Sequence, residues 1–253
     1  MIEFVCVIPA RYASTRLPGK QLIDLGGKPM VVRVAERAAA SGASRVVIAT
    51  DDVRVAQAAA AHGCEVAMTS AEHASGTDRL AEVVTQLGLP ERAIVVNVQG
   101  DEPLIPPQMI RAVAEELAGH ANAAMATACH PLADAAEMAN PHVVKVVLDH
   151  RGYALYFSRA PIPYARDAFS RGIESIPAGL PAYRHIGLYA YRAEFLRAFT
   201  SLKPAAIETF ESLEQLRALW YGERISVVVM PEAPPGGVDT PEDAARVART
   251  FRV

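Results

Sequence analysis

Short apolar runs alternate along this chain with longer, alanine-rich stretches. The runs are residues 4–8, 45–49, 65–68, 93–98 and 123–128. They are too continuous for strands with one face in water, and they are typical of the buried strands of a parallel sheet. The pattern therefore predicts a buried sheet in the first half of the chain.

Between these runs, alanine, leucine and valine recur at the spacing of amphipathic helices. The expected helices are residues 29–40, 52–62, 77–87 and 107–118, followed by the helix-terminating glycines Gly42, Gly63, Gly88 and Gly119. Regular alternation of strand and helix indicates βαβ units. We therefore expect an α/β, nucleotide-binding type of core over the first 120 residues.

The pattern changes after Pro141. Residues 143–148 and 153–157 flank a tight turn, which predicts an antiparallel pair, and the proline-rich stretch 160–181 predicts a loop. The remaining expected elements are a strand at 183–191, helices at 192–200 and 208–221, a strand at 225–230 and a helix at 240–249. We predict a single domain over 1–253 with an inserted lobe at 141–192.

Composition narrows the class of protein. The chain has 253 residues, 51% of them hydrophobic and 21% charged, which is ordinary for a globular protein. Its 25 lysines and arginines against 28 aspartates and glutamates leave a net charge of −3, so no basic surplus predicts binding to nucleic acid or to an anionic membrane.

The cysteines and the apolar runs bear on the compartment. Cys6, Cys64 and Cys129 are far apart and form no CxxC pair, so neither a disulfide framework nor a zinc site is expected. No apolar run approaches the roughly 18 residues of a membrane span, and the N-terminal run has an acid where a signal peptide is basic. We expect a cytoplasmic protein.

The loop after the first strand, residues 9–20, carries the local positive charge that binding of a small anion requires. It holds Arg11, Arg16 and Lys20, with Ser14 as a hydroxyl donor. Loops at the carboxyl ends of parallel strands bind ligands in open α/β sheets, so we predict a phosphate site here. The plain alternative is a solvated basic loop. Neither a Walker A motif nor GxGxxG is present.

Two aspartates have positions that suit a divalent cation. Asp101 follows the fourth apolar run, and Asp239 follows a glycine pair before the last helix. Carboxylates at such positions hold Mg²⁺ in many nucleotide enzymes, although each could instead be a turn or helix-capping residue. Together with the basic loop, they predict metal-assisted phosphoryl transfer. The chain has no GxSxG or HExxH motif, so hydrolase templates do not apply.

These stretches resemble the 3-deoxy-manno-octulosonate cytidylyltransferases, or CMP-Kdo synthetases. The matching motifs span nearly the whole chain: Pro9-Ala-Arg-x-x-Ser-Thr-Arg-Leu-Pro-Gly-Lys20, Ser75-Gly-Thr-Asp-Arg79, Val96-Asn-Val-Gln-Gly-Asp-Glu-Pro103, Val143-Val-Lys-Val-Val-Leu148, Tyr153-Ala-Leu-Tyr-Phe-Ser-Arg-Ala160, Arg184-His-Ile-Gly-Leu-Tyr189, Leu213-Glu-Gln-Leu-Arg217, Leu219-Trp-Tyr-Gly222 and Gly237-Val-Asp-Thr-Pro-Glu-Asp243. The resemblance implies a nucleotide-diphospho-sugar-transferase-like, Rossmann-like fold with a mixed, mostly parallel sheet and a small antiparallel dimerisation lobe. It also implies a homodimer that joins CTP to Kdo and releases pyrophosphate.

The resemblance assigns roles by position. It implies that nucleotide binding involves Ala10, Arg11, Ser14, Arg16, Lys20, Gly76, Arg79 and Gln99. It implies Mg²⁺ at Asp101 and Asp239, which with Lys20 form the catalytic set, and a sugar-acid site made of Arg159, Arg166, His185, Tyr189, Glu214 and Gln215. The chain departs from the family at Tyr164-Ala165, where the pattern has an aromatic residue and an acid.

The sequence also predicts an anion-binding site in the inserted lobe independently of the resemblance. Four cationic or titratable residues cluster there: Arg159, Arg166, Arg184 and His185. A set of surface ion pairs is the plain alternative. Two other functions remain open: a cytidylyltransferase for 8-amino-Kdo or sialic acid, and a noncatalytic nucleotide-binding module. The second is disfavoured because Asp101, Asp239 and Lys20 are all present. No side chain is an obvious general base.

Overall fold

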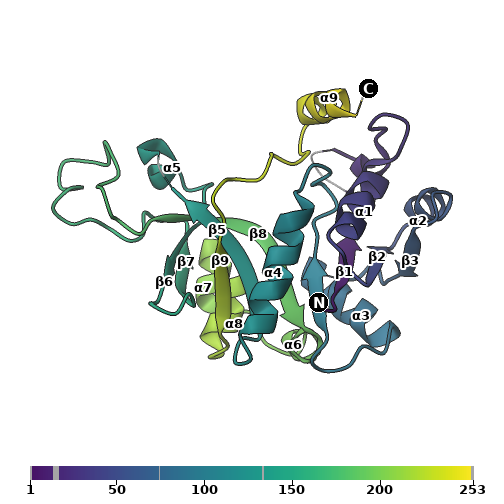
Figure 1. The fold of residues 1–253 in the computed structure, drawn as a ribbon, viewed down its shortest axis with the longest axis horizontal. Coiled ribbons are helices and arrows are strands. Elements are labelled where there is room, and N and C mark those ends of the chain that lie inside the picture. The colour runs from purple at the N-terminus through teal and green to yellow at the C-terminus, as the bar shows by residue number, and fades with distance from the viewer. Residues whose placement is uncertain (1, 14–16, 74, 133, 252–253) are drawn as a thin grey trace.

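The computed structural model describes residues 2–13, 17–73, 75–132 and 134–251. A nine-stranded sheet crosses the molecule, with its main path in the order β3-β2-β1-β4-β8-β5-β9 (Figure 1). The strands on this path are β1 (Val5–Pro9), β2 (Arg45–Thr50), β3 (Glu65–Met68), β4 (Ile94–Asn97), β5 (Met125–Pro131), β8 (Tyr183–Arg192) and β9 (Ile225–Val229).

The pairing is mixed but mostly parallel. β1 pairs in parallel with β2 and β4, β2 with β3, and β5 with β9, whereas β8 is antiparallel to β4 and β5. The α/β class and the mostly parallel sheet predicted from the apolar runs are confirmed.

Helices cover both faces of the sheet, because successive residues of a strand point to opposite sides. In β1, Cys6 and Ile8 pack with α1 (Met30–Ala40), α2 (Val53–Ala60) and α4 (Pro107–Gly119). Val5 and Val7 pack with α3 (Gly76–Gln86), α6 (Ala193–Phe199) and α8 (Gln215–Trp220) on the other face. The four helices expected in the first half of the chain are present, with ends shifted by a few residues.

The inserted hairpin continues the sheet. β6 (Lys145–Leu148) pairs with β7 (Ala154–Ser158) and also with the first residues of β8. A bridge between Tyr153 and Ser226 brings the start of β7 back to β9. The segment between β7 and β8 projects beyond the sheet beside α5 (Ala135–Ala139), a helix that the sequence pattern did not predict (Figure 1).

The single helix expected at 208–221 is wrong. The chain forms α7 (Ala206–Glu211) and then α8, and Ser212 between them adopts a left-handed conformation with φ 51°. The last helix, α9 (Pro241–Thr250), is capped by the Thr240 hydroxyl, which accepts a hydrogen bond from the Asp243 N–H. Asp239 is therefore not the N-cap. No helix in the described part of the chain has the length and apolar character needed to cross a membrane.

Candidate active site

A cavity of about 250 Å³ opens at the carboxyl ends of β1 and β4. The predicted nucleotide-binding residues that line it are Arg11, Lys20, Gly76 and Gln99, and the predicted metal-binding residue Asp101 lines it as well. These side chains come from three separate parts of the chain and meet where open α/β sheets bind ligands. Ser14 and Arg16, which the resemblance also assigns to the nucleotide, lie outside the described residues. Ala10 is fully buried beside this edge, with its N–H bonded to the Ala49 carbonyl.

The two described parts of the basic loop, residues 9–13 and 17–20, meet just before the short 3₁₀ turn η1 (Lys20–Leu22). Gly19 has φ 69°, a left-handed conformation that suits glycine, and its N–H donates to the Tyr12 carbonyl at 3.1 Å. The Arg11 guanidinium donates to the carbonyl oxygen of His73 at 2.5 Å. Arg11 is thus anchored to the segment between β3 and α3, and the described parts of the basic loop, residues 9–13 and 17–20, are held by hydrogen bonds to the protein.

Lys20 lies between the two predicted metal-binding carboxylates. Its Nζ is 2.5 Å from Asp101 Oδ2 and 3.7 Å from Asp239 Oδ1. The Lys20 side chain is only 13% exposed, which strengthens its attraction to both acids. Two aspartates that are remote in sequence therefore share one site, as the sequence predicted.

The backbone brings Asp239 to this position. Residues 230–240, the segment between β9 and α9, are called the strap below. Val238 in the strap donates its N–H to the Asp101 carbonyl at 2.8 Å, which aligns the strap with the turn after β4. A Cβ atom added at Gly237 would lie 2.9 Å from that same carbonyl oxygen, closer than real Cβ atoms come. Only glycine at position 237 permits this approach without a shift of the backbone.

The two carboxylates fit a magnesium ion. Mg²⁺ is commonly held by one or two protein carboxylates and takes its remaining ligands from substrate phosphates and water. No cluster of three or more His, Cys, Asp or Glu side chains with metal-binding geometry occurs within the described residues. The donor set of Asp101 and Asp239 therefore suits a metal that arrives with a polyphosphate, and it does not suit a closed structural metal site.

Two residues of this site were missed from the sequence. Gln21 lines the cavity at only 3% exposure, and its buried Oε1 has no hydrogen-bond partner. Glu102 follows Asp101, and burial, reinforced by the Asp101 charge, raises the pKa of Glu102 to about 7. No motif in the sequence singles out Gln21 as a site residue, because it reaches the cavity only through its packing against Gly100 in the folded chain.

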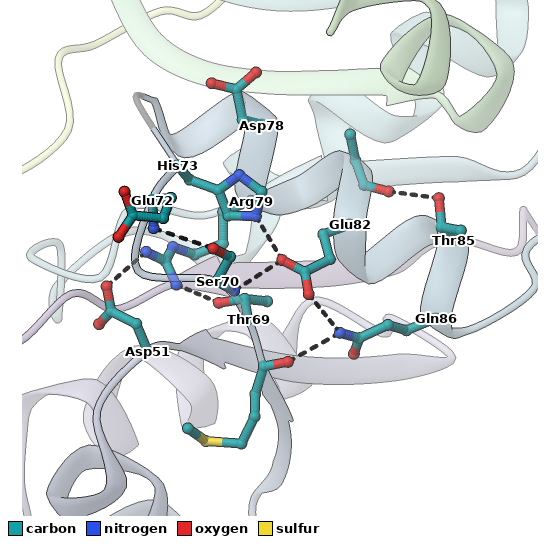
Figure 2. A network of polar contacts seen from close by, with 12 residues as sticks. Asp51, Thr69, Ser70, Glu72, His73, Asp78, Arg79, Glu82, Thr85 and Gln86 are labelled. Atoms are coloured by element: carbon teal, nitrogen blue, oxygen red, sulfur yellow. Dashed lines mark hydrogen bonds and ion pairs between the residues drawn. The ribbon is translucent and has the colours of Figure 1, made fainter.

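Arg79 lies in a buried network instead of lining the cavity (Figure 2). Its guanidinium donates to Asp51 Oδ2 at 2.8 Å and also bonds the Thr69 hydroxyl. The side chain is fully buried, so it joins the ends of β2 and β3 to α3. The contacts of Arg79 in this structure are with protein groups, although the resemblance implies a place around the base and ribose.

The same network orders the segment that holds Arg11. His73 Nε2 lies 2.5 Å from Glu82 Oε2, which also accepts the N–H of Ser70 at 2.9 Å (Figure 2). Hydrogen bonds from His73 and Ser70 oppose the effect of burial and leave the pKa of Glu82 below its usual value. Glu82 therefore fixes the segment whose carbonyl accepts from Arg11.

His185 and Tyr189, predicted for the sugar acid, lie on β8 with their rings 5.4 Å apart. His185 also packs edge-on against Phe157, and its Nε2 is 2.9 Å from the Thr127 hydroxyl. Burial lowers the pKa of His185 to about 3 and raises that of Tyr189 well above its usual value. Both side chains are therefore neutral at physiological pH.

Glu214 and Gln215 begin α8 on the same side of the sheet. Glu214 Oε2 accepts a hydrogen bond from the Thr77 hydroxyl at 2.5 Å. Gln215 is 7% exposed, and its buried Nε2 has no hydrogen-bond partner. A buried donor of this kind is uncommon in native proteins and often marks a ligand-binding position.

The arginines of the predicted sugar site divide into two groups. Arg159 donates to the carbonyls of Glu211 at 2.6 Å and Ser212 at 3.3 Å, so it is held against the turn before Glu214. The Arg166 side chain is 95% exposed on the projecting segment and lies 3.8 Å from Asp167. Arg184 pairs with Glu137. The structure holds Arg159 beside the turn before Glu214 and leaves Arg166 and Arg184 in surface ion pairs.

A mixed sheet with basic residues and two carboxylates around Lys20 at its carboxyl edge is typical of the nucleotidyltransferase fold. Comparison with known proteins narrows the class. The cytidylyltransferase family model matches residues 5–225, and the chain belongs to that family.

A solved structure described as CMP:2-keto-3-deoxy-manno-octonic acid synthetase complexed with CTP is similar over almost the whole length. The identity is 43% over 99% of this chain and 98% of the other, with a TM-score of 0.88. The family resemblance identified from the sequence motifs is confirmed.

Proposed function

We propose that this chain transfers CMP from CTP to 3-deoxy-D-manno-octulosonate (Kdo), forming CMP-Kdo and pyrophosphate for lipopolysaccharide synthesis. The observation that carries the proposal is the meeting of Lys20, Asp101 and Asp239 at the cavity edge. Full-length similarity to a CMP-Kdo synthetase supports the choice of nucleotide and sugar.

The side chains around the cavity act by positioning and by neutralising charge. Arg11 and Lys20 bind the phosphates of CTP, which are the anions that match their charge at this edge of the sheet. The anomeric hydroxyl of Kdo then attacks the α-phosphorus in line, and pyrophosphate leaves. Holding the two reactants in this alignment removes much of the entropic part of the barrier.

Asp101 and Asp239 would hold Mg²⁺. When bound, the ion would neutralise phosphate charge and lower the pKa of a substrate hydroxyl, which removes the need for a strong general base. Lys20, which lies 2.5 Å from Asp101, would then share its charge between the carboxylates and the phosphates. Electrostatic stabilisation of this kind supplies a large part of catalysis in phosphoryl transfer.

The sugar side combines neutral and charged groups. His185, Tyr189 and Gln215 offer hydrogen bonds to hydroxyls, and Glu214 accepts them. Arg159 supplies positive charge for the sugar carboxylate, since its five N–H donors exceed the carbonyl contacts that it makes here. The role of Arg166 stays a prediction that rests on the resemblance alone.

We also propose a homodimer formed through the inserted hairpin. The nearly unbroken apolar strand predicted at 143–148 would not be stable with an open edge in water, so its sequence favours a second subunit as a cover. In the structure, β6 pairs with β7 along its length and with β8 at Lys145 and Val146, and Val146 is fully buried, so part of this cover comes from the chain itself. Within the described residues β7 pairs only with β6, and its Leu155 side chain is 60% exposed, so a second β7 could pair with it antiparallel about a two-fold axis.

The compartment proposed is the cytoplasm. Cys6, Cys64 and Cys129 are far apart in the sequence and form no CxxC pair, which supports a protein kept in reducing conditions.

Pyrophosphate release tests the function directly. The purified protein with Mg²⁺ is assayed with CTP, UTP, ATP and GTP, each combined with Kdo, 8-amino-Kdo or sialic acid. We expect the highest kcat/KM for CTP with Kdo. A preference for another sugar acid would change the assigned substrate, and release with no pair while CTP still binds would indicate a noncatalytic module.

A further inference from the structure

A single hydroxyl joins the nucleotide side of the active site to the sugar side. Thr77 is the second residue of α3, directly after Gly76, which lines the nucleotide cavity. Its Oγ1 donates to Glu214 Oε2 at 2.5 Å, across 137 positions of sequence. Thr77 is only 3% exposed, so its hydroxyl serves a protein partner.

Thr77 sets the direction of the Glu214 carboxylate. Glu214 occupies the N-cap position of α8, yet its side chain makes no capping hydrogen bond to that helix. The backbone of α8 therefore leaves this carboxylate unoriented. The short contact from Thr77, made to a charged acceptor in a partly buried setting, supplies the missing orientation.

Thr77 is itself held rigidly. Ser75 caps α3 through the Asp78 N–H, and the Asp78 side chain accepts in return from the Ser75 N–H. This reciprocal capping fixes the first turn of the helix, which contains both Gly76 and Thr77. A displacement of the Gly76 backbone would therefore move the Thr77 hydroxyl as well.

Two further polar side chains, Tyr191 and Asn97, lie around the contact between Thr77 and Glu214. Burial, followed by the negative charge of Glu214, raises the pKa of Tyr191, and hydrogen bonds with Thr77 and Asn97 oppose that rise. Asn97 is 4% exposed at the end of β4, and its Oδ1 has no hydrogen-bond partner. α3, β4, β8 and α8 thus meet in one buried polar cluster.

We propose that Thr77 is a positioning residue that orients Glu214 toward Kdo and couples the sugar site to the nucleotide site. The inference rests on the proposed function, in which Glu214 binds the sugar acid. CTP bound along Gly76 then favours the Glu214 orientation that receives Kdo, and by reciprocity Kdo tightens CTP binding.

Kinetics of two substitutions at this position test the inference. Thr77→Val keeps the shape of the side chain and removes the hydroxyl, whereas Thr77→Ser keeps the hydroxyl. We expect Thr77→Val to raise the KM for Kdo about tenfold, the effect of losing one charge-assisted hydrogen bond, and to change the Kd for CTP alone less than twofold. Thr77→Ser should restore the KM for Kdo to within about threefold of the original value.

The matched control is Thr85→Val, the same substitution in the same helix. The Thr85 hydroxyl donates to the Ala81 carbonyl within α3, so its loss should leave both substrates unaffected. Melting temperatures of all variants show whether a change in kinetics is a change in folding.

A double-mutant cycle with Glu214→Gln identifies the partner through which Thr77 acts. We expect Thr77→Val to add little to the defect of Glu214→Gln. Additive defects, equal losses for CTP and Kdo, or no rescue by serine would each overturn the positioning role. The proposed function fails separately, if the unmodified protein releases no pyrophosphate from CTP and Kdo.

Discussion

The N–H of Val238 donates to the carbonyl oxygen of Asp101 at 2.8 Å. This one backbone hydrogen bond joins the strap before α9 to the turn after β4, and so it sets the separation of the two carboxylates. Lys20 then meets both acids from the basic loop. The proposed metal site therefore depends on backbone alignment as much as on the acids themselves.

Substituting Gly237 tests this alignment without removing any charged group. In Gly237→Val, the added Cβ would lie 2.9 Å from the Asp101 carbonyl oxygen and force the strap away. We expect weaker activation by Mg²⁺, measured as a higher concentration for half-maximal kcat. Gly119→Val is the comparison, because a Cβ at Gly119 meets nothing within 4 Å. Equal Mg²⁺ dependence in both variants would contradict the alignment.

Neutralising either aspartate should abolish turnover and leave the fold intact. Asp101→Asn or Asp239→Asn removes a metal ligand from the reaction site, so kcat should fall at least about 100-fold at saturating Mg²⁺. Circular dichroism should show an unchanged fold, since both side chains are partly exposed. A near-normal kcat in either variant would rule out that residue as a metal ligand.

Different substitutions should weaken the binding of CTP and of Kdo independently. Lys20→Ala removes a charge at the nucleotide cavity and should weaken CTP binding measured by calorimetry. Arg159→Ala should raise the KM for Kdo with little change in CTP affinity, because its contacts lie at the turn before Glu214. If Arg159→Ala lost as much CTP affinity as Lys20→Ala, the two sites would be misassigned.

His185 should make the protein less stable in acid. Its pKa is about 3 when folded and about 6.5 when unfolded, so between these pH values the unfolded state binds more protons. The free energy of unfolding therefore falls as pH drops below 6.5, by about 1.4 kcal/mol per pH unit at most from this residue.

Urea unfolding of His185→Gln checks this prediction. The variant should lose less stability than the unmodified protein between pH 7 and pH 5, whereas substitution of the exposed His150 by glutamine should change nothing. Identical pH dependence in all three proteins would show that His185 is not the desolvated group that the structure indicates.

A charge on the edge strand should separate the proposed dimer. Leu155→Lys places an ammonium group on the exposed side of β7, where a second copy would pack. Light scattering at micromolar concentration should show a dimer for the unmodified chain and a monomer for the variant. Val53→Lys, at an equally exposed valine on α2, is the control and should remain dimeric. A monomeric unmodified chain would contradict the proposal.

Much of the fold was predictable because its strands are buried on both faces. Continuous apolar runs such as the one that forms β4 can hardly be anything but sheet interior, and the strands follow them closely. The meeting of the two aspartates around Lys20 was predictable for a similar reason. Asp101 and Asp239 each follow glycine-containing turns, and their meeting required only that both turns lie at one edge.

The break between α7 and α8 was not predictable from local sequence. No glycine or proline lies near Ser212, and the apolar spacing continues across it. The left-handed residue is accommodated by a remote group, since Arg159 donates to the carbonyls on either side of the turn. The buried position of Arg79 was not predictable either, because the motif around it does not indicate that Asp51 is its partner. Contacts that span the fold override local pattern in both cases.

The strap carries Asp239 near the end of the described residues, so the parts of the site form at different times during synthesis. When a ribosome has synthesised residues 1–230, every strand of the sheet exists, as do Lys20 and Asp101. The second carboxylate and the N–H of Val238 are still missing, and so is α9, which packs with Leu25 and Met30. A nascent chain can therefore form the sheet before Asp239 has been made, so the proposed metal site is complete only after α9 has been synthesised and has packed against Leu25 and Met30.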